Sequence, residues 1–230
     1  MTVLNIAMVG SDDLAKSIAK ATDQRDVHTY VNKESGPDGA RILSIIRPAK
    51  MPERIRPFFN SLCAARVGLL EVTGIDAAFG EVLVGFASAG INKGIFVINP
   101  SDGEWIDEGQ VKGFLAQAGL SSWTQGGTDG IELRSALYGL MDDISSDLES
   151  AKKEPLVVPV DQYFNVKGIG LVAIGYVQAG SVSVHAELQL LPAEGPGTVK
   201  SLQVMDDDVE EAVAGDRVGI ALRNTKEDHL

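Results

Sequence analysis

The chain is poor in cysteine and in long apolar runs. Cys63 is the single cysteine among 230 residues, so no intrachain disulfide can form, and a secreted, disulfide-stapled domain is excluded. No apolar stretch approaches the roughly 18 residues that a membrane-spanning helix needs, and no basic segment precedes the first apolar run. We therefore expect neither a signal peptide nor a membrane span, and a cytoplasmic location.

Basic residues are also scarce. The chain has 20 Lys and Arg against 32 Asp and Glu, which gives a formal net charge of −12. Non-specific binding to a nucleic-acid backbone requires a basic surface, so this balance argues against DNA binding and against general RNA binding, while leaving room for a local basic patch. The hydrophobic fraction of 44% is ordinary for a folded chain, whose length suits one large or two modest domains.

Short apolar runs alternate with stretches at helical spacing through the first two thirds of the chain. This alternation predicts βαβ units and a mostly parallel sheet covered by helices on both faces. In the helix that begins near Pro52, apolar residues from Ile55 to Leu62 recur at the spacing of one helical face. The expected strands are Val3–Val9, Val27–Val31, Ala40–Ile46, Val67–Val72 and Gly94–Asn99, and the other expected helices are Leu14–Ala21, Ala77–Ala89, Glu108–Ala118 and Gly130–Leu148.

The pattern changes at residues 151–155. From Leu156 onward the sequence consists of short apolar strands separated by Gly and Pro, without a helix-length periodic run. Such spacing is typical of a small antiparallel β-barrel. We therefore expect two domains, an α/β domain at residues 1–152 and an all-β domain at residues 153–230.

The segment from Gly10 to Ser17 partly matches the phosphate-binding pattern G-x-x-x-x-G-K-[ST]. It follows the first apolar strand, and Gly10, Lys16 and Ser17 stand at three of the four defining positions. In that pattern backbone N–H groups surround the phosphates, the lysine neutralises their charge and the hydroxyl holds Mg²⁺. These three residues are therefore candidates for a nucleotide site.

The same segment also departs from the pattern. Ala15 replaces the second glycine, whose lack of a Cβ allows close approach of the phosphates, and Asp12 and Asp13 add negative charge. Three interpretations stay open: a relic that binds nucleotide poorly or not at all, a site with residual binding, and an ordinary strand–turn–helix with a solvated lysine.

The second half of the chain resembles a known family. Five ordered blocks carry the resemblance, at residues 164–170, 175–180, 187–192, 199–204 and 210–219. They resemble domain 2 of the translational GTPases, which include elongation factor Tu, elongation factor 1-alpha and the selenocysteine-specific elongation factor with its archaeal relatives. The resemblance implies a P-loop-GTPase-like domain followed by an elongation-factor β-barrel.

The family's other motifs are mostly lost from the first half. Where the family has D-x-x-G, this chain has Arg47–Lys50, and too few residues follow the first helix for the segment that binds Mg²⁺. In the base-reading motif [NT]-K-x-D, Asn99 and Asp102 persist while Pro100 replaces the lysine. The resemblance thus implies a relic nucleotide site at Gly10, Lys16, Ser17, Asn99 and Asp102, with no catalytic residue.

Basic residues concentrate between Arg41 and Arg66, a stretch in which Glu53 is the only acid. This local excess makes the stretch a candidate contact for RNA phosphates or for an acidic partner. A solvated helix face is the alternative. The candidate residues are Arg47, Lys50, Arg54 and Arg56.

These observations predict a non-hydrolysing, elongation-factor-like protein that binds a component of the translation machinery, namely a tRNA, the ribosome or another factor. No resident cofactor is expected, apart from GTP or GDP with Mg²⁺ if the relic site still binds. The three histidines are scattered and form no metal-binding spacing with Cys63. Two alternatives stay open: a GTP-binding elongation factor with residual GTPase activity, and a regulatory protein-interaction module without RNA contact.

Overall fold

The computed structural model describes residues 2–24, 27–37, 39–51, 53–100, 104–204 and 207–230. The chain divides into two compact units, Met1–Ile144 and Ser145–Leu230. The first is a mostly parallel sheet covered by helices and the second is an antiparallel β-structure, which confirms the predicted fold class.

The first unit is built on a seven-stranded sheet in the order β2-β3-β4-β1-β5-β6-β7. Strand β1 lies between β4 and β5 and is parallel to both, and β6 and β7 continue the parallel part. Strands β2, β3 and β4 are successive antiparallel neighbours. The strands are β1 Thr2–Val9, β2 Lys20–Gln24, β3 Val27–Gly36, β4 Gly39–Pro48, β5 Val67–Val72, β6 Gly94–Ile98 and β7 Thr124–Gly126.

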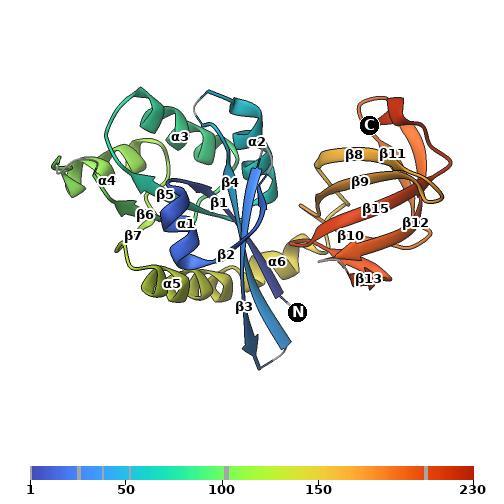
Figure 1. Ribbon diagram of the computed structural model, residues 1–230, viewed down its shortest axis with the longest axis horizontal. Helices are drawn as coiled ribbons and strands as arrows, with labels where there is room; N and C mark the ends of the chain where they lie inside the picture. The colour runs from blue at the N-terminus through green and yellow to red at the C-terminus, as the bar shows by residue number, and fades with distance from the viewer. Residues whose placement is uncertain (1, 25–26, 38, 52, 101–103, 205–206) are drawn as a thin grey trace. The chain divides into compact units, whose positions relative to one another are not determined.

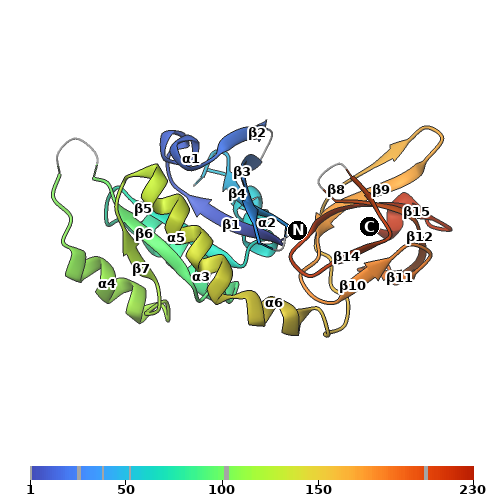
Figure 2. The same ribbon diagram turned by 90° about the horizontal axis from the view of Figure 1, so that it is seen from below.

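Helices cover both faces of this sheet (Figures 1 and 2). Helices α1 and α5 pack together, while α2, α3 and α4 share one apolar core with the opposite face. An aspartate carboxylate caps each of α3, α4 and α5 by accepting backbone N–H bonds in the first turn, which explains where these helices begin. The helices are α1 Asp12–Ile18, α2 Ile55–Ala64, α3 Ala77–Ser88, α4 Glu108–Gln117 and α5 Gly130–Asp143.

Trp123 anchors the core beneath α3. Its indole lies over Gly68 and Gly94, where an added Cβ would come within 2.2 Å and 2.6 Å of the ring. The ring N–H donates to the Ile91 carbonyl at 3.1 Å, and the Phe86 ring centroid is 4.9 Å away. The two glycines thus make room for one large side chain against β5 and β6.

The first helix is shorter than the sequence predicts. It ends at Ile18 because Ala19 adopts an extended conformation, and the chain then pairs with β3 as the edge strand β2. The predicted helix Leu14–Ala21 was therefore wrong beyond Ile18, where pairing with β3 replaces the last helical turn.

Helix α2 buries only part of its predicted apolar face. Phe58 and Leu62 enter the core, whereas Ile55 and Phe59 are 58% and 52% exposed. The helical spacing was predicted correctly, but the apolar residues cover a wider arc of the helix than the sheet buries.

The second unit begins with α6 Ser145–Ala151 and continues as antiparallel strands around a core of Val, Leu and Ile side chains. One sheet has the order β11-β12-β15-β9-β8 with β13 added to β12, and β10 pairs with β14. No helix in the described part of the chain is long and apolar enough to cross a membrane. The strands are β8 Val160–Val166, β9 Gly170–Tyr176, β10 Ser181–Ser183, β11 Glu187–Leu190, β12 Gly195–Val204, β13 Asp207–Val209, β14 Glu211–Val213 and β15 Arg217–Arg223.

Candidate functional site

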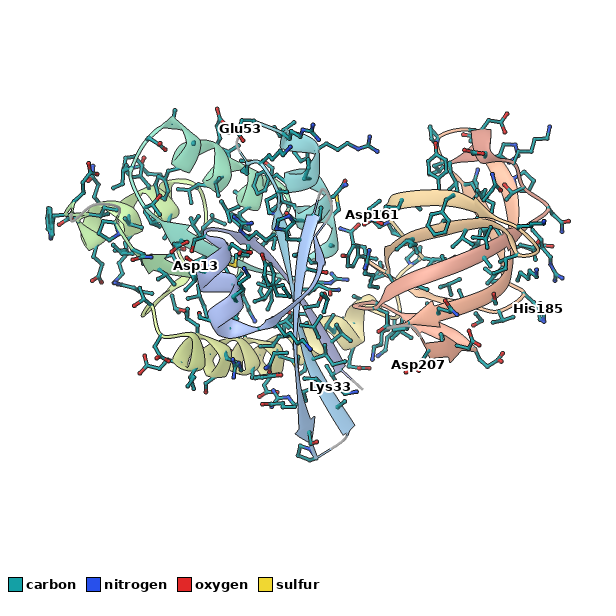
Figure 3. The ribbon with its side chains drawn as sticks, viewed as in Figure 1. Asp13, Lys33, Glu53, Asp161, His185 and Asp207 are labelled. Carbon is teal, nitrogen blue, oxygen red and sulfur yellow. The ribbon has the colours of Figure 1, made fainter. Side chains whose placement is uncertain are left out.

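The turn at Gly10 and Ser11 joins the carboxyl end of β1 to α1. Ser11 caps the helix, because its hydroxyl oxygen accepts the N–H of Leu14 at 3.2 Å. The helix therefore starts at Asp12, and Ala15 is fully buried in its second turn. The residues that would wrap around a phosphate in a P-loop are here helical, and Asp13 lies on the first turn of α1 (Figure 3).

The carboxylate of Glu71 occupies the space in front of this turn. Glu71 is the fifth residue of the fully buried strand β5, and its side-chain Oε2 accepts the N–H of Ser11 at 2.5 Å. Its Oε1 accepts the Asn99 amide at 2.6 Å, and the residue is only 6% exposed. A Cβ added to Gly10 would lie 2.8 Å from the Glu71 Cβ, so glycine is required for this approach. A carboxylate of the chain itself thus takes the anion position at the turn.

The two other P-loop-like side chains are bonded within α1. The Lys16 ammonium forms an ion pair with Asp12 at 2.5 Å, and the Ser17 hydroxyl donates to the Leu14 carbonyl at 2.7 Å. With the anion position filled and both groups engaged, the residues in this arrangement do not fit a magnesium-bound nucleotide. No group of three His, Cys, Asp or Glu side chains suited to a metal gathers among the described residues.

Of the base-reading pair, Asn99 follows β6 and directs its side-chain amide to Glu71. This bond ties the end of β6 to the turn after β1. Asp102, the other predicted member, lies outside the described residues.

Tyr30 and Asp12 form a second link at the start of α1. The fully buried Tyr30 hydroxyl donates to the Asp12 carboxylate. Burial, followed by this bond and the Asp12 charge, raises the pKa of Tyr30 to about 12. The bond to Lys16, followed by the one from Tyr30, lowers the pKa of Asp12 below its usual value.

The raised Tyr30 pKa predicts an alkaline loss of stability. The Tyr30 hydroxyl holds its proton more tightly in the folded chain than in the unfolded chain. Its contribution to the free energy of unfolding is therefore complete below pH 10 and is lost as the pH rises towards 12. We expect Tyr30→Phe to lower the free energy of unfolding near about pH 8 and to narrow that deficit near about pH 11. Urea unfolding at both pH values measures this, and a deficit that does not change with pH would contradict it.

The basic stretch does not form one surface. Arg41 pairs with Asp142 at 2.6 Å and with Glu34 at 3.3 Å, at the other end of β4. Arg47 donates from Nε to the Gly10 carbonyl at 2.6 Å and so supports the turn. Of the four predicted contact residues, the exposed ones are Lys50, Arg54 and Arg56, which gather around the start of α2.

A cavity of about 500 Å³ adjoins the turn at the carboxyl ends of β1 and β5. Crevices at the carboxyl ends of parallel strands, where connections leave to opposite sides, are the usual ligand positions in open α/β sheets. Its charged lining residues are Arg47, Lys50, Glu71 and Asp76, and apolar side chains of β5 and α3 contribute to the remaining lining.

Glu71 is the main site residue that the sequence reasoning missed. It stands as one charged residue in the run Val67–Val72, all of whose residues are buried. A carboxylate in a buried strand must find hydrogen-bond donors, which is the signal that was available. The sequence does not indicate which donors it finds.

Comparison with known proteins finds relatives for the chain. Residues 170–230 match the family model for elongation factor Tu domain 2. Over its full length the chain is 29% identical to an uncharacterised protein of Methanocaldococcus jannaschii, of which it covers 70%. It is 40% identical over 101 residues to the selenocysteine-specific elongation factor of that organism, a match that covers 43% of this chain and 21% of that protein.

Solved structures show the same fold. A bacterial selenocysteine-specific elongation factor aligns with all of this chain at a TM-score of 0.78 and 22% identity, and the chain covers 44% of it. The elongation factor SelB of Methanococcus maripaludis in its apo form aligns at 0.72 and 20% identity, with 54% of that chain covered. This chain thus spans about half of each of these structures. Residues 170–230 thus match the elongation factor Tu domain 2 family, and the whole chain shares its fold with selenocysteine-specific elongation factors, which supports a relationship with the translational GTPase-like superfamily.

Proposed function

We propose that this chain is a non-hydrolysing, elongation-factor-like protein that binds a component of the translation machinery in the cytoplasm. The observation that carries the proposal is the Glu71 carboxylate, which takes the anion position in front of the Gly10 turn. A nucleotide phosphate would have to displace an internal anion that already holds one backbone N–H and one amide. The chain keeps the scaffold of its superfamily and uses it for binding.

The relic nucleotide residues support this view through their present bonds. Lys16 pairs with Asp12 and Ser17 donates to the Leu14 carbonyl, both within α1. The Gly10 carbonyl accepts a hydrogen bond from Arg47 Nε. A second candidate function is that of a GTP-binding elongation factor, because a SelB structure with 22% identity is described as a complex with the GTP analogue GPPNHP. A regulatory protein-interaction module without RNA contact is the third.

Titration with a fluorescent GTP analogue separates the first two functions. We expect no saturable, Mg²⁺-dependent signal up to about 100 µM nucleotide, whereas a genuine GTP-binding factor measured in parallel saturates. Binding with a dissociation constant below about 1 µM would overturn the proposal. Co-sedimentation with ribosomes then tests the binding role, and a chain that neither sediments with ribosomes nor binds tRNA would leave only the third function.

A further inference from the structure

The outer face of α2 exposes apolar side chains in a row. Ile55, Phe59 and Cys63 follow one another at four-residue intervals, which places them on one side of the helix, and all three are exposed. Among the described residues, no other helix exposes two large apolar side chains one turn apart. We call these three residues the α2 stripe. Contiguous apolar surface of this kind indicates a contact site.

Positive charge surrounds the beginning of this stripe. Lys50, Arg54 and Arg56 are exposed there. Glu53, which Figure 3 labels, is the only acid among them. The local charge is therefore +2 in a chain whose net charge is −12. An acidic partner is attracted to this place and repelled by most of the remaining surface, which orients it during encounter.

The combination favours a protein partner over RNA. Backbone phosphates are bound by arrays of cations, whereas two arginines of this stretch are engaged elsewhere, Arg41 with acidic side chains and Arg47 with the Gly10 turn. Three exposed cations supply little affinity for RNA at physiological salt. An exposed isoleucine has no role in stacking on bases, whereas Ile and Phe one turn apart suit the apolar side of another helix.

We propose that the α2 stripe docks an acidic amphipathic helix of a partner protein. The apolar side of that helix covers Ile55 and Phe59, and its flanking Asp and Glu residues face Lys50, Arg54 and Arg56. This inference deepens the proposed function, on which it rests, by naming the chemistry of the partner.

The test uses a fluorescein-labelled synthetic helix of about 18 residues, with leucine at i, i+3, i+4 and i+7 and glutamate on its other faces. Fluorescence anisotropy measures its binding to the whole protein. A scrambled peptide of equal composition and a peptide with lysine in place of glutamate are the control ligands. We expect the acidic amphipathic peptide to bind at least about tenfold more tightly than either control.

Variants locate the binding. Phe59→Glu and Arg56→Glu should each weaken peptide binding by about tenfold or more. If Phe59→Glu folds poorly, Ile55→Glu tests the apolar contact instead. Matched controls are Ile131→Glu, an exposed apolar residue on α5, and Lys33→Glu, an exposed cation on β3 away from α2 (Figure 3). Both controls should stay within about twofold of the unchanged protein. Circular dichroism and thermal melting verify that each variant is folded.

Several results would overturn the inference. The first is that the scrambled peptide binds as tightly as the acidic amphipathic peptide, and the second is that neither Phe59→Glu nor Ile55→Glu weakens peptide binding. The third is that a labelled oligouridine binds more tightly than the peptide. The fourth is that the protein sediments as a dimer which Phe59→Glu dissociates. Ribosome co-sedimentation separates this failure from that of the proposed function. If Phe59→Glu still associates with ribosomes, the docking surface is contradicted but the proposed function is not. If the peptide binds in a Phe59-dependent way but the protein associates with neither ribosomes nor tRNA, the translation role is contradicted but the docking surface is not.

Discussion

Trp123→Ala is expected to lower the free energy of unfolding by about 3–5 kcal/mol, the cost of removing a large buried side chain from a packed core. The indole is 5% exposed and fills the space that Gly68 and Gly94 leave against the sheet. Neither glycine can refill that space, and the Ile91 carbonyl loses its donor. The cavity therefore remains, and its cost adds to the lost apolar burial.

Urea unfolding followed by far-ultraviolet circular dichroism measures this loss without relying on the removed fluorophore. The matched control is Trp105→Ala, since Trp105 is 81% exposed and its removal should change stability by less than about 0.5 kcal/mol. A loss below about 1 kcal/mol for Trp123→Ala would show that this indole is not the anchor of the core.

Glu71→Ala is expected to lower the free energy of unfolding by about 2–3 kcal/mol, because it removes two charge-assisted hydrogen bonds and leaves space at a buried position. The Ser11 N–H at the start of α1 and the Asn99 amide both lose their acceptor. Glu71→Gln keeps the shape and one acceptor oxygen, so it should lose only about 1 kcal/mol. The difference in the free energy of unfolding between the two variants separates the effect of the lost side-chain volume from that of the lost hydrogen bonds.

The same variant has a second readout. Although Glu71→Ala removes the internal anion, it should not create Mg²⁺-dependent binding of a fluorescent GTP analogue, because Lys16 and Ser17 remain bonded inside α1. Glu81→Ala, at an exposed position of α3, is the matched control and should cost less than about 0.5 kcal/mol. If Glu71→Ala is as stable as this control, or gains tight nucleotide binding, the account of the turn is wrong.

Strong local patterns allowed most of the first sheet to be predicted. The run Val67–Val72 was predicted with the correct ends, because six successive buried residues admit little else. The edge strand β2 was missed, since the residues before it continue a helical pattern and its pairing with β3 is a tertiary contact. Strands of three residues, such as β7, β10 and β14, are too short to carry a period.

The candidate site shows a different limit. The sequence indicated that Gly10, Lys16 and Ser17 stand in a P-loop-like pattern, but the pattern does not reveal which partners they choose. Glu71 comes from another strand, and its carboxylate reaches the turn only because β5 lies beside β1. Likewise, four arginines and lysines close in sequence are divided between the turn and α2 by the fold.

The short link between α1 and β2 bears on how long a complex lasts. Ala19 alone separates the helix from an edge strand that is already hydrogen-bonded to β3, so the described part of this link offers no long segment to be ordered or released. Factors that act as timers use such a segment to convert a chemical event into partner release. In the binding role that we propose, the lifetime of a complex follows from its dissociation rate, so a variant that weakens binding also shortens the time for which the complex lasts.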